Sequence, residues 1–167
     1  MLIEAALTTI IIGLAFVAIM QLFAACTQQN RVGVNMTTAM LLAGHIQETM
    51  TGLAFNDPAL ANTYFGPEPG QTLKAYDDVD DFDGLSLNPP IDSLRRPIPA
   101  LNQFTQIVNV MPVYATQLSS NTDPTAPTIP KSTYTGAVRV MVRILYTPNT
   151  TSPPMEVFRT SWIRVDD

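Results

Sequence analysis

A long stretch without any charge near the start of the chain constrains its fold most. No acidic or basic residue occurs from Ala5 to Asn30, and the part from Ala5 to Cys26 is apolar except for Thr8, Thr9 and Gln21. As a helix, Ala5–Asn30 would be about 39 Å long, more than the roughly 30 Å hydrocarbon core of a bilayer. A helix of that length, apolar on every side, is unusual in a chain of 167 residues unless it lies in a membrane. The sequence therefore predicts a membrane-embedded helix.

One carboxylate, Glu4, precedes this apolar stretch. A carboxylate at membrane depth is energetically costly, so an unpaired one is by default a functional-site hypothesis. The alternative is that Glu4 lies at the level of the lipid headgroups and stabilises the helix N-terminus through the macrodipole. No basic region comes before the stretch and no A-x-A-like site ends it, so we expect a retained segment rather than a cleaved secretory signal.

The helical pattern continues from residue 27 to residue 55. Its apolar positions recur three or four apart, with mostly polar residues between them; they are Val32, Met36, Met40 or Ala39, Ala43, Ile46, Met50 and Leu53. Gly52 and the Asn56-Asp57-Pro58 segment predict the end of the helix. We therefore expect one helix of about 50 residues and about 75 Å. Residues 1–26 would form its membrane or filament-core part, and residues 27–55 its amphipathic part.

Residues 56–101 are rich in proline and in acidic residues and are expected to form loops. Five aspartates lie close together there: Asp77, Asp78, Asp80, Asp81 and Asp83. Carboxylate oxygens are the ligands that Ca²⁺ prefers, which makes this run a candidate calcium site. The run lacks the EF-hand spacing, because counting back from Gly84 places Val79 at the first ligand position. The alternative is an acidic loop that faces solvent or a neighbouring subunit.

Residues 102–167 are predicted to form an antiparallel sheet. In the run 136–146, Val138, Val140, Val142 and Ile144 share one face and Arg139, Met141 and Arg143 share the other. The runs 103–113 and 155–165 are also rich in residues that favour strands. The expected fold class is α+β, with a long N-terminal helix packed on an antiparallel sheet of three to four strands.

Composition excludes several classes of function. The net charge of −5 gives no broadly basic surface for nucleic acid. Cys26 and His45 are each the single residue of their type, so an intrachain disulfide and a zinc site of Cys and His are excluded; we expect Cys26 to pack as a small hydrophobe. We find no nucleophile–base pair, phosphate loop or catalytic carboxylate pair and expect a protein that is not an enzyme.

Asn149-Thr150-Thr151 matches the N-glycosylation sequon, with Asn149 as the acceptor.

The order of Leu2-Ile3-Glu4, an apolar stretch, an amphipathic helix and a sheet resembles the type IV pilins and pseudopilins. In that family a leader peptide is removed after a glycine, the new first residue is methylated, and the glutamate is fifth. Here Glu4 is fourth, so the resemblance implies one residue ahead of Met1 or a variant start. Gly13 occupies the place of a family glycine that weakens the helix. Gln21 stands where the family often has a proline, so we expect unwinding only near Gly13.

The resemblance implies a structural subunit of an extracellular helical filament, without a cofactor, that polymerises through its N-terminal helix. Unassembled subunits would reside in the inner membrane with the pilus assembly machinery. Glu4 of one subunit would pair with the N-terminal ammonium of a neighbour, at Met1 or a residue ahead of it. Such a pair would specify axial register more than stability.

Two alternatives remain open at this point. One is a minor pilin or a pseudopilin of a type II secretion machine, which would share the same N-terminus. The other, from a different class, is a monomeric membrane-anchored binding protein. Adhesion, motility, DNA uptake and electron conduction all use pilus-like fibres, and the sequence does not choose among them.

Overall fold

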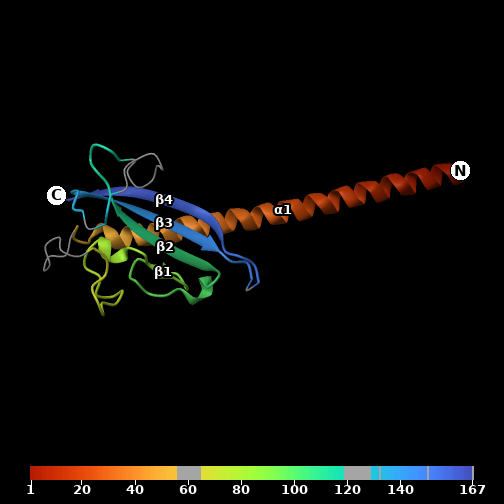
Figure 1. Ribbon diagram of the computed structural model, residues 1–167. Coiled ribbons are helices and arrows are strands. Elements are labelled where there is room, and N and C mark those ends of the chain that lie inside the picture. Colours follow the sequence, from red (N-terminus) through yellow and green to blue (C-terminus); the bar gives the residue numbers. More distant parts are fainter. Residues whose placement is uncertain (56–64, 119–128, 132, 150, 167) are drawn as a thin grey trace. The chain divides into compact units, whose positions relative to one another are not determined.

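The computed structural model describes the chain except for residues 56–64, 119–128, 132, 150 and 167. The elements follow in the order α1, η1, β1, η2, β2, β3 and β4 (Figure 1). By its internal contacts the chain divides into two compact units, residues 1–37 and residues 38–167. The first unit is helical, and the second contains the sheet.

The helix α1 spans Leu2–Thr51 and confirms the expected long helix. In the first unit it runs unbroken through Gly13. Its threonines bond within the helix, and Thr8 Oγ1, for example, donates to the Glu4 carbonyl at 2.8 Å. This internal bond satisfies the hydroxyl among apolar side chains without a partner from outside the helix.

α1 ends four residues before Phe55, the expected limit of the amphipathic part. Gly52 follows the last helical residue, Thr51, and Ala54 already forms an isolated parallel bridge with Asp78. The apolar spacing extended the prediction too far, because the residues after Thr51 pack on the core from a backbone that is no longer helical.

A side chain from the sheet caps the C-terminal end of α1. The last helical turn contains no basic residue. Arg164, in strand β4 (Met155–Val165), donates from its guanidinium to the carbonyls of Thr51 at 3.1 Å and Leu53 at 2.9 Å. A cation bonded to the free carbonyls at the negative end of the helix dipole stabilises that end.

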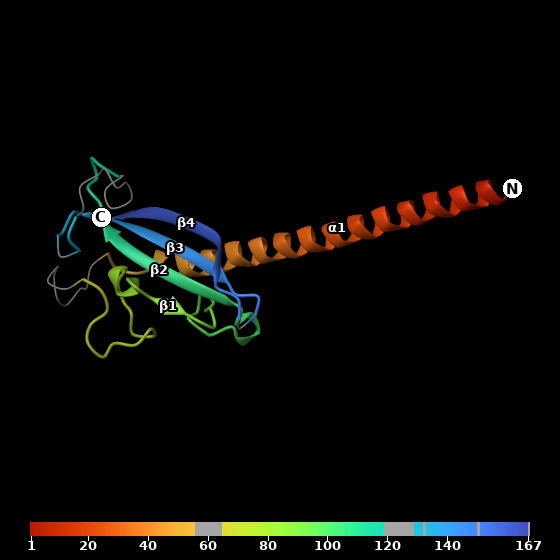
Figure 2. The same ribbon diagram turned by 45° about the vertical axis from the view of Figure 1, so that its right-hand side comes forward.

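The sheet is antiparallel, with four strands in the order β1-β2-β3-β4 (Figures 1 and 2). Their bounds are β1 Ser86–Leu87, β2 Phe104–Pro112, β3 Ala137–Tyr146 and β4 Met155–Val165. The last three match the predicted runs to within one residue at each end, and the α+β class is confirmed. β1 was not predicted, because it lies in residues 56–101 and two residues are too few to show a strand alternation.

The core lies between one face of the sheet and the part of α1 in the second unit. Val138, Val140, Val142 and Ile144 are all buried, as their alternation predicts. The buried residues of α1 are Ala39, Leu42, Ala43, Ile46 and Met50. The predicted stripe of apolar positions along α1 offered Met40 or Ala39 at one place; Ala39 is right and Met40 is wrong, since it is 47% exposed. Leu42, omitted from the stripe, is 1% exposed because it shares the face of Ala39 and Ile46.

One buried polar side chain joins three parts of the second unit. Gln106 on β2 is fully buried. Its Nε2 donates to the carbonyls of Leu42 at 2.9 Å and Ile91 at 3.1 Å, and its Oε1 accepts the Ile91 amide at 2.7 Å. Because every polar atom of the amide is engaged, Gln106 fixes the helix and the loop to the sheet without leaving an unsatisfied group.

Candidate functional site

The first unit presents an apolar surface on every side. All residues from Met1 to Val34 are exposed, including Ile11 at 65%, Phe16 at 60% and Phe23 at 66%. By length and composition α1 is able to cross a membrane. Contiguous apolar surface of this extent marks contact with lipid or with other protein.

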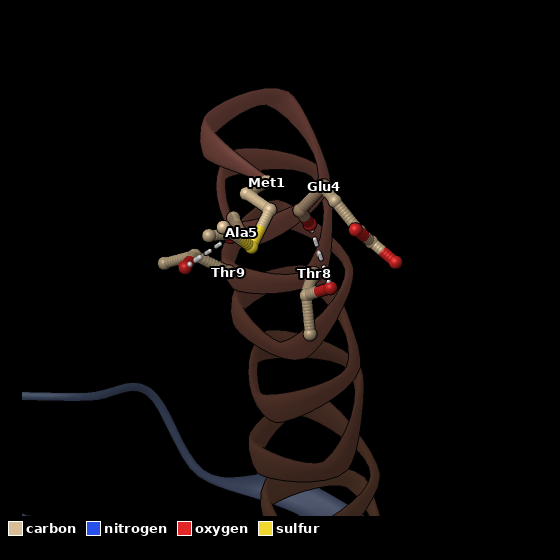
Figure 3. A pocket seen from close by; sticks show the side chains of 5 residues that line it. All are labelled: Met1, Glu4, Ala5, Thr8 and Thr9. Atoms are coloured by element: carbon tan, nitrogen blue, oxygen red, sulfur yellow. Dashed lines mark hydrogen bonds between the residues drawn. The ribbon is translucent and has the colours of Figure 1, made fainter.

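Glu4 and Met1 lie in the first turn of this unit. Figure 3 shows the Glu4 carboxyl projecting outward from the helix. The Ala5 amide donates to the Met1 carbonyl at 3.1 Å, which extends helical bonding to the first residue. Within the part of the chain that the structure describes, Glu4 forms no ion pair.

Two other residues of the first unit were singled out in the sequence. Gly13 is helical, and a Cβ placed there would meet nothing within 4 Å. Unwinding near Gly13 therefore stays a prediction about the assembled state. Cys26 is exposed, so the expectation that it packs as a small hydrophobe is wrong within the chain itself.

The acidic run forms a buried turn in the second unit. Its centre is the 3₁₀-helix η1 (Asp80–Phe82), and the Asp81 amide donates to Asp78 Oδ1 at 3.0 Å. Phe82 packs edge-on against Tyr76, with their ring centroids 5.2 Å apart. This packing carries Asp78 and Asp81 into the interior, where they are 2% and 0% exposed.

The structure separates the five candidate aspartates into two groups. Asp80 Oδ2 accepts the Gly66 amide at 2.8 Å. Asp83 accepts the Val110 amide at 3.0 Å and forms an ion pair with Lys131. Asp83 is thus held by partners outside the run, whereas the Asp80 carboxyl also hydrogen-bonds the Asp78 carboxyl.

The remaining three form what we call the acidic cluster, namely Asp77, Asp78 and Asp81. Each contributes one carboxylate oxygen to a group whose members lie within 4.8 Å of one another. Asp81 Oδ2 accepts the Asp77 amide at 3.0 Å and Gln71 Nε2 at 3.2 Å. Asp77 is exposed, so the cluster reaches solvent on one side.

Burial makes the charged state of these acids unfavourable. Burial is the largest cause of a rise in the pKa of Asp78 to about 8; the Asp81 amide opposes this rise, and the nearby charges of Asp80 and Asp81 add to it. Burial also raises the pKa values of Asp80 and Asp81, although amide hydrogen bonds oppose the shift. Near neutral pH, burial therefore favours the protonated form of Asp78.

A different carboxylate shows the opposite behaviour. Glu156 on β4 lies between Arg143 and Arg159, which donate to it at 2.7 Å each. Hydrogen bonds from Arg159 and then Arg143 lower the pKa of Glu156 to about 2. This exposed carboxylate has both oxygens engaged within the sheet, whereas Asp81 Oδ1 has no hydrogen-bond partner among the described residues.

Asn149 lies exposed in the connection between β3 and β4. Its Oδ1 accepts the amides of Thr151 at 3.0 Å and Ser152 at 2.8 Å. Thr150, the middle residue of the sequon, lies outside the described residues. Glycosylation of Asn149 stays a prediction.

Comparison of the chain with known protein families, with curated proteins and with solved structures found no match. Sequence reasoning missed Gln106 and Arg164, which anchor α1. A glutamine within an apolar alternation is a usable signal for the first, whereas nothing local to Arg164 indicates its distant carbonyl partners.

Proposed function

We propose that the chain is a structural subunit of an extracellular helical filament of the type IV pilus kind, assembled through residues 1–37. The observation that carries the proposal is the apolar surface of this unit, which is exposed around the whole helix from Met1 to Val34. Water is a poor solvent for such a surface. Lipid before assembly and copies of the same helix after assembly are environments that bury it.

The distribution of apolar residues favours a bundle of many helices over a simple pair. A two-stranded coiled coil needs one apolar stripe and leaves the opposite face polar. Residues 5–26 have no polar face, so each helix needs neighbours on all sides. When identical subunits meet through two different surfaces and the contact does not close, a helical polymer results.

Glu4 supplies the register that apolar contact lacks. Hydrophobic association is non-directional, so helices without another constraint slide along one another at little cost. In the proposed filament, Glu4 pairs with the N-terminal ammonium of a neighbouring subunit, at Met1 or at a residue ahead of it. The attraction grows as the effective dielectric falls, while desolvation offsets much of it. The pair therefore defines the axial position more than it adds stability.

Glu4 substitutions test this role in cells that assemble the filament. Glu4→Ala and Glu4→Gln are compared with Glu48→Gln, an exposed carboxylate on the same helix but in the second unit. Electron microscopy of sheared cell-surface material measures fibres, and immunoblots of membrane fractions measure the unassembled subunit. We expect both Glu4 variants to reach the membrane with at least about tenfold fewer fibres, because the neighbour's charge loses its partner. Glu48→Gln should assemble normally.

The outcomes separate the alternatives. Abundant, normally built fibres from Glu4→Ala would contradict the pairing. A wild-type protein found solely as detergent-soluble monomers would indicate a membrane-anchored binding protein. Trace amounts within fibres built from another subunit would indicate a minor pilin or pseudopilin. Mass spectrometry of the N-terminal peptide identifies the first residue and its methylation.

A further inference from the structure

We propose that Arg31, just beyond the apolar stretch of α1, binds the phosphate of a phospholipid headgroup and so sets how deeply the unassembled subunit lies in the membrane. This role rests on the membrane stage of the proposed function. It goes beyond that function by naming the residue and the lipid group that meet. Arg31 takes no part in the pairing proposed for Glu4.

The position of Arg31 along α1 fits the headgroup layer opposite Glu4. The helix is unbroken over this range, and Ala5–Cys26 is about 33 Å long, close to the roughly 30 Å hydrocarbon core. Residues 27–30 are polar but uncharged. Glu4 and Arg31 are then about 40 Å apart along the axis, near the roughly 40–45 Å of a bilayer with its headgroups. When Glu4 lies in one headgroup layer, Arg31 therefore lies in the other.

α1 has no other residue of the kind that anchors a membrane helix at this level. Trp, Tyr, Lys and Arg are the side chains that commonly hold such helices at the headgroups. α1 contains no Trp, Tyr or Lys, and Arg31 is its only Arg. The next basic residue along the chain is Lys74. The anchoring of this side of the helix therefore depends on Arg31.

The charge of Arg31 is not neutralised by the described part of its own chain. Arg31 is exposed. Residues three or four positions away are its neighbours on the helix surface, and they are Thr27, Gln28, Val34 and Asn35. None of the ion pairs among the described residues involves Arg31. An anion beside α1 can therefore bind this guanidinium without displacing an internal partner.

The surface around Arg31 is shaped for a headgroup above an acyl chain. An open hollow on the helix is lined by Phe23, Ala24, Thr27, Gln28 and Arg31. Thr27 Oγ1 donates to the Phe23 carbonyl at 2.9 Å, so this hydroxyl is satisfied within the helix. Helical side chains lean toward the N-terminus, which directs Arg31 back toward the apolar stretch. The hollow thus has a polar end at Gln28 and Arg31 and an apolar end at Phe23.

The chemistry of the guanidinium selects phosphate among the headgroup components. The fork of an arginine donates two parallel hydrogen bonds to a phosphate, and the charge strengthens both. A headgroup built of sugar alone presents neutral hydroxyls and forms no such pair. Phospholipid phosphates are also present at this depth around a subunit that has no protein neighbour. A carboxylate of another protein is the alternative partner, and the test below distinguishes it.

The test uses the full chain, diluted from detergent into preformed phosphatidylglycerol vesicles. Cys26 is the single cysteine and lies about 7.5 Å below Arg31 along the helix axis. Its rate of reaction with a charged, water-soluble maleimide reports its depth, because a thiol in hydrocarbon does not ionise. Flotation and resistance to alkaline extraction measure insertion separately.

Two double variants move the arginine along the helix in opposite directions. Arg31→Gln with Gln28→Arg moves it about 4.5 Å toward the N-terminus, and Arg31→Gln with Val34→Arg moves it about 4.5 Å the other way. Both new positions are exposed. If phosphate holds the arginine, the first variant shifts Cys26 toward water and the second shifts it deeper. We expect the reaction rate to rise and to fall, respectively, by at least about threefold.

Two controls assign these shifts to the phosphate. Glu48→Gln changes an exposed charge on the same helix in the second unit and should react like wild type. In vesicles of a phosphate-free galactolipid with the same acyl chains, both double variants should react like wild type. The local charge near Cys26 is the same in the two lipids, so a direct effect of the moved arginine on the thiol would persist there.

The outcomes separate this role from the proposed function. Equal shifts in both lipids would overturn phosphate as the partner. Unchanged rates in phosphatidylglycerol, from proteins that do insert, would overturn the anchoring role and leave Arg31 to a carboxylate of another protein. A wild-type chain that does not insert would overturn the membrane stage and this role together. The expected shifts from a chain that never forms fibres in cells would contradict the filament alone.

Discussion

The first unit and the acidic cluster lie in opposite environments. Residues 1–37 expose apolar side chains over the helix surface. The cluster instead buries the carboxylates of Asp78 and Asp81. Apolar surface calls for lipid or protein, whereas buried negative charge calls for a proton or a cation.

The two kinds of partner differ in how narrowly they are specified. Hydrophobic contact is proportional to area and has no direction, so the apolar surface alone accepts many arrangements. Ligand geometry around an ion is defined to within a few tenths of an ångström. The proposed filament therefore needs Glu4 for its register.

The largest effect should follow from a charge placed in the apolar unit. Val17 lies near the middle of the uncharged stretch and is 53% exposed. Lysine at the centre of a membrane helix costs about 2.5–3.5 kcal/mol, so Val17→Lys should lower the insertion equilibrium about 100-fold and remove filaments. Alkaline extraction of membranes and electron microscopy measure these losses.

The control for Val17→Lys is Gln28→Lys, near the end of the stretch, where lysine can reach the headgroups. It should insert normally. Unfolding of residues 38–167 should be the same in both variants. A Val17→Lys protein that inserts and assembles like wild type would break the comparison, because the exposed apolar surface would then have no role in either step.

A core truncation should affect the second unit instead. Ile46 is fully buried against the sheet, whereas Met40 on the same helix is 47% exposed. Ile46→Ala should lower the free energy of unfolding by about 2–5 kcal/mol through lost burial and a residual cavity. Met40→Ala should change it by less than about 0.5 kcal/mol. Urea titration followed by Trp162 fluorescence measures both, and equal losses would show that Met40 is buried too.

The contact at the end of α1 should have a smaller effect. Arg164→Ala removes the hydrogen bonds to Thr51 and Leu53 and should lower the free energy of unfolding by about 1–2 kcal/mol. Arg164→Lys keeps the charge but loses the fork and should recover part of the loss. Urea titration again provides the measurement. An unchanged Arg164→Ala protein would show that water replaces the guanidinium.

The smallest effect concerns Glu156, the acid that is satisfied within the chain. Its pKa is lowered from 4.5 to about 2, so the folded protein binds fewer protons there than the unfolded protein. Its stabilisation is therefore present above pH 4.5 and is lost as the pH falls through about 2. Because the pair is at the surface, the difference in free energy of unfolding between wild type and Glu156→Gln should be about 0–1 kcal/mol near pH 6.

Thermal unfolding at a series of pH values checks this sign. The difference between wild type and Glu156→Gln should narrow steadily between pH 4.5 and pH 2. A difference that widens on acidification would show that Arg143 and Arg159 do not hold the carboxylate in its charged form.

The sequence predicted the elements that depend on local periodicity. Residues 5–30 lack charge, and this alone indicates an apolar helix. The alternation from Val138 to Ile144 predicted both the strand β3 and its buried face. Local periodicity did not predict β1 or the helix end at Thr51. Both depend on pairing between residues distant along the chain, Ser86 with Ile107 and Ala54 with Asp78.

The candidate sites divide in the same way. Glu4 is recognisable in the sequence, because a single acid beside a long apolar stretch stands out without any tertiary information. The acidic run was also visible, but the choice of Asp77, Asp78 and Asp81 among its five members was not. That choice follows from the Gly66 and Val110 amides and from Lys131, which engage the other two aspartates.

What the sequence by itself determined is the chain's need to cover an apolar helix, since hydrophobicity and helical period are properties of neighbouring residues. Only the tertiary structure decided which distant polar groups contact one another. Gln106 donates to the Leu42 carbonyl, Arg164 donates to the Thr51 carbonyl, and one carboxylate oxygen each from Asp77, Asp78 and Asp81 lie within 4.8 Å of one another. Such contacts join residues far apart in the chain. Their partners are selected by the packing of the whole unit, and no local pattern encodes them.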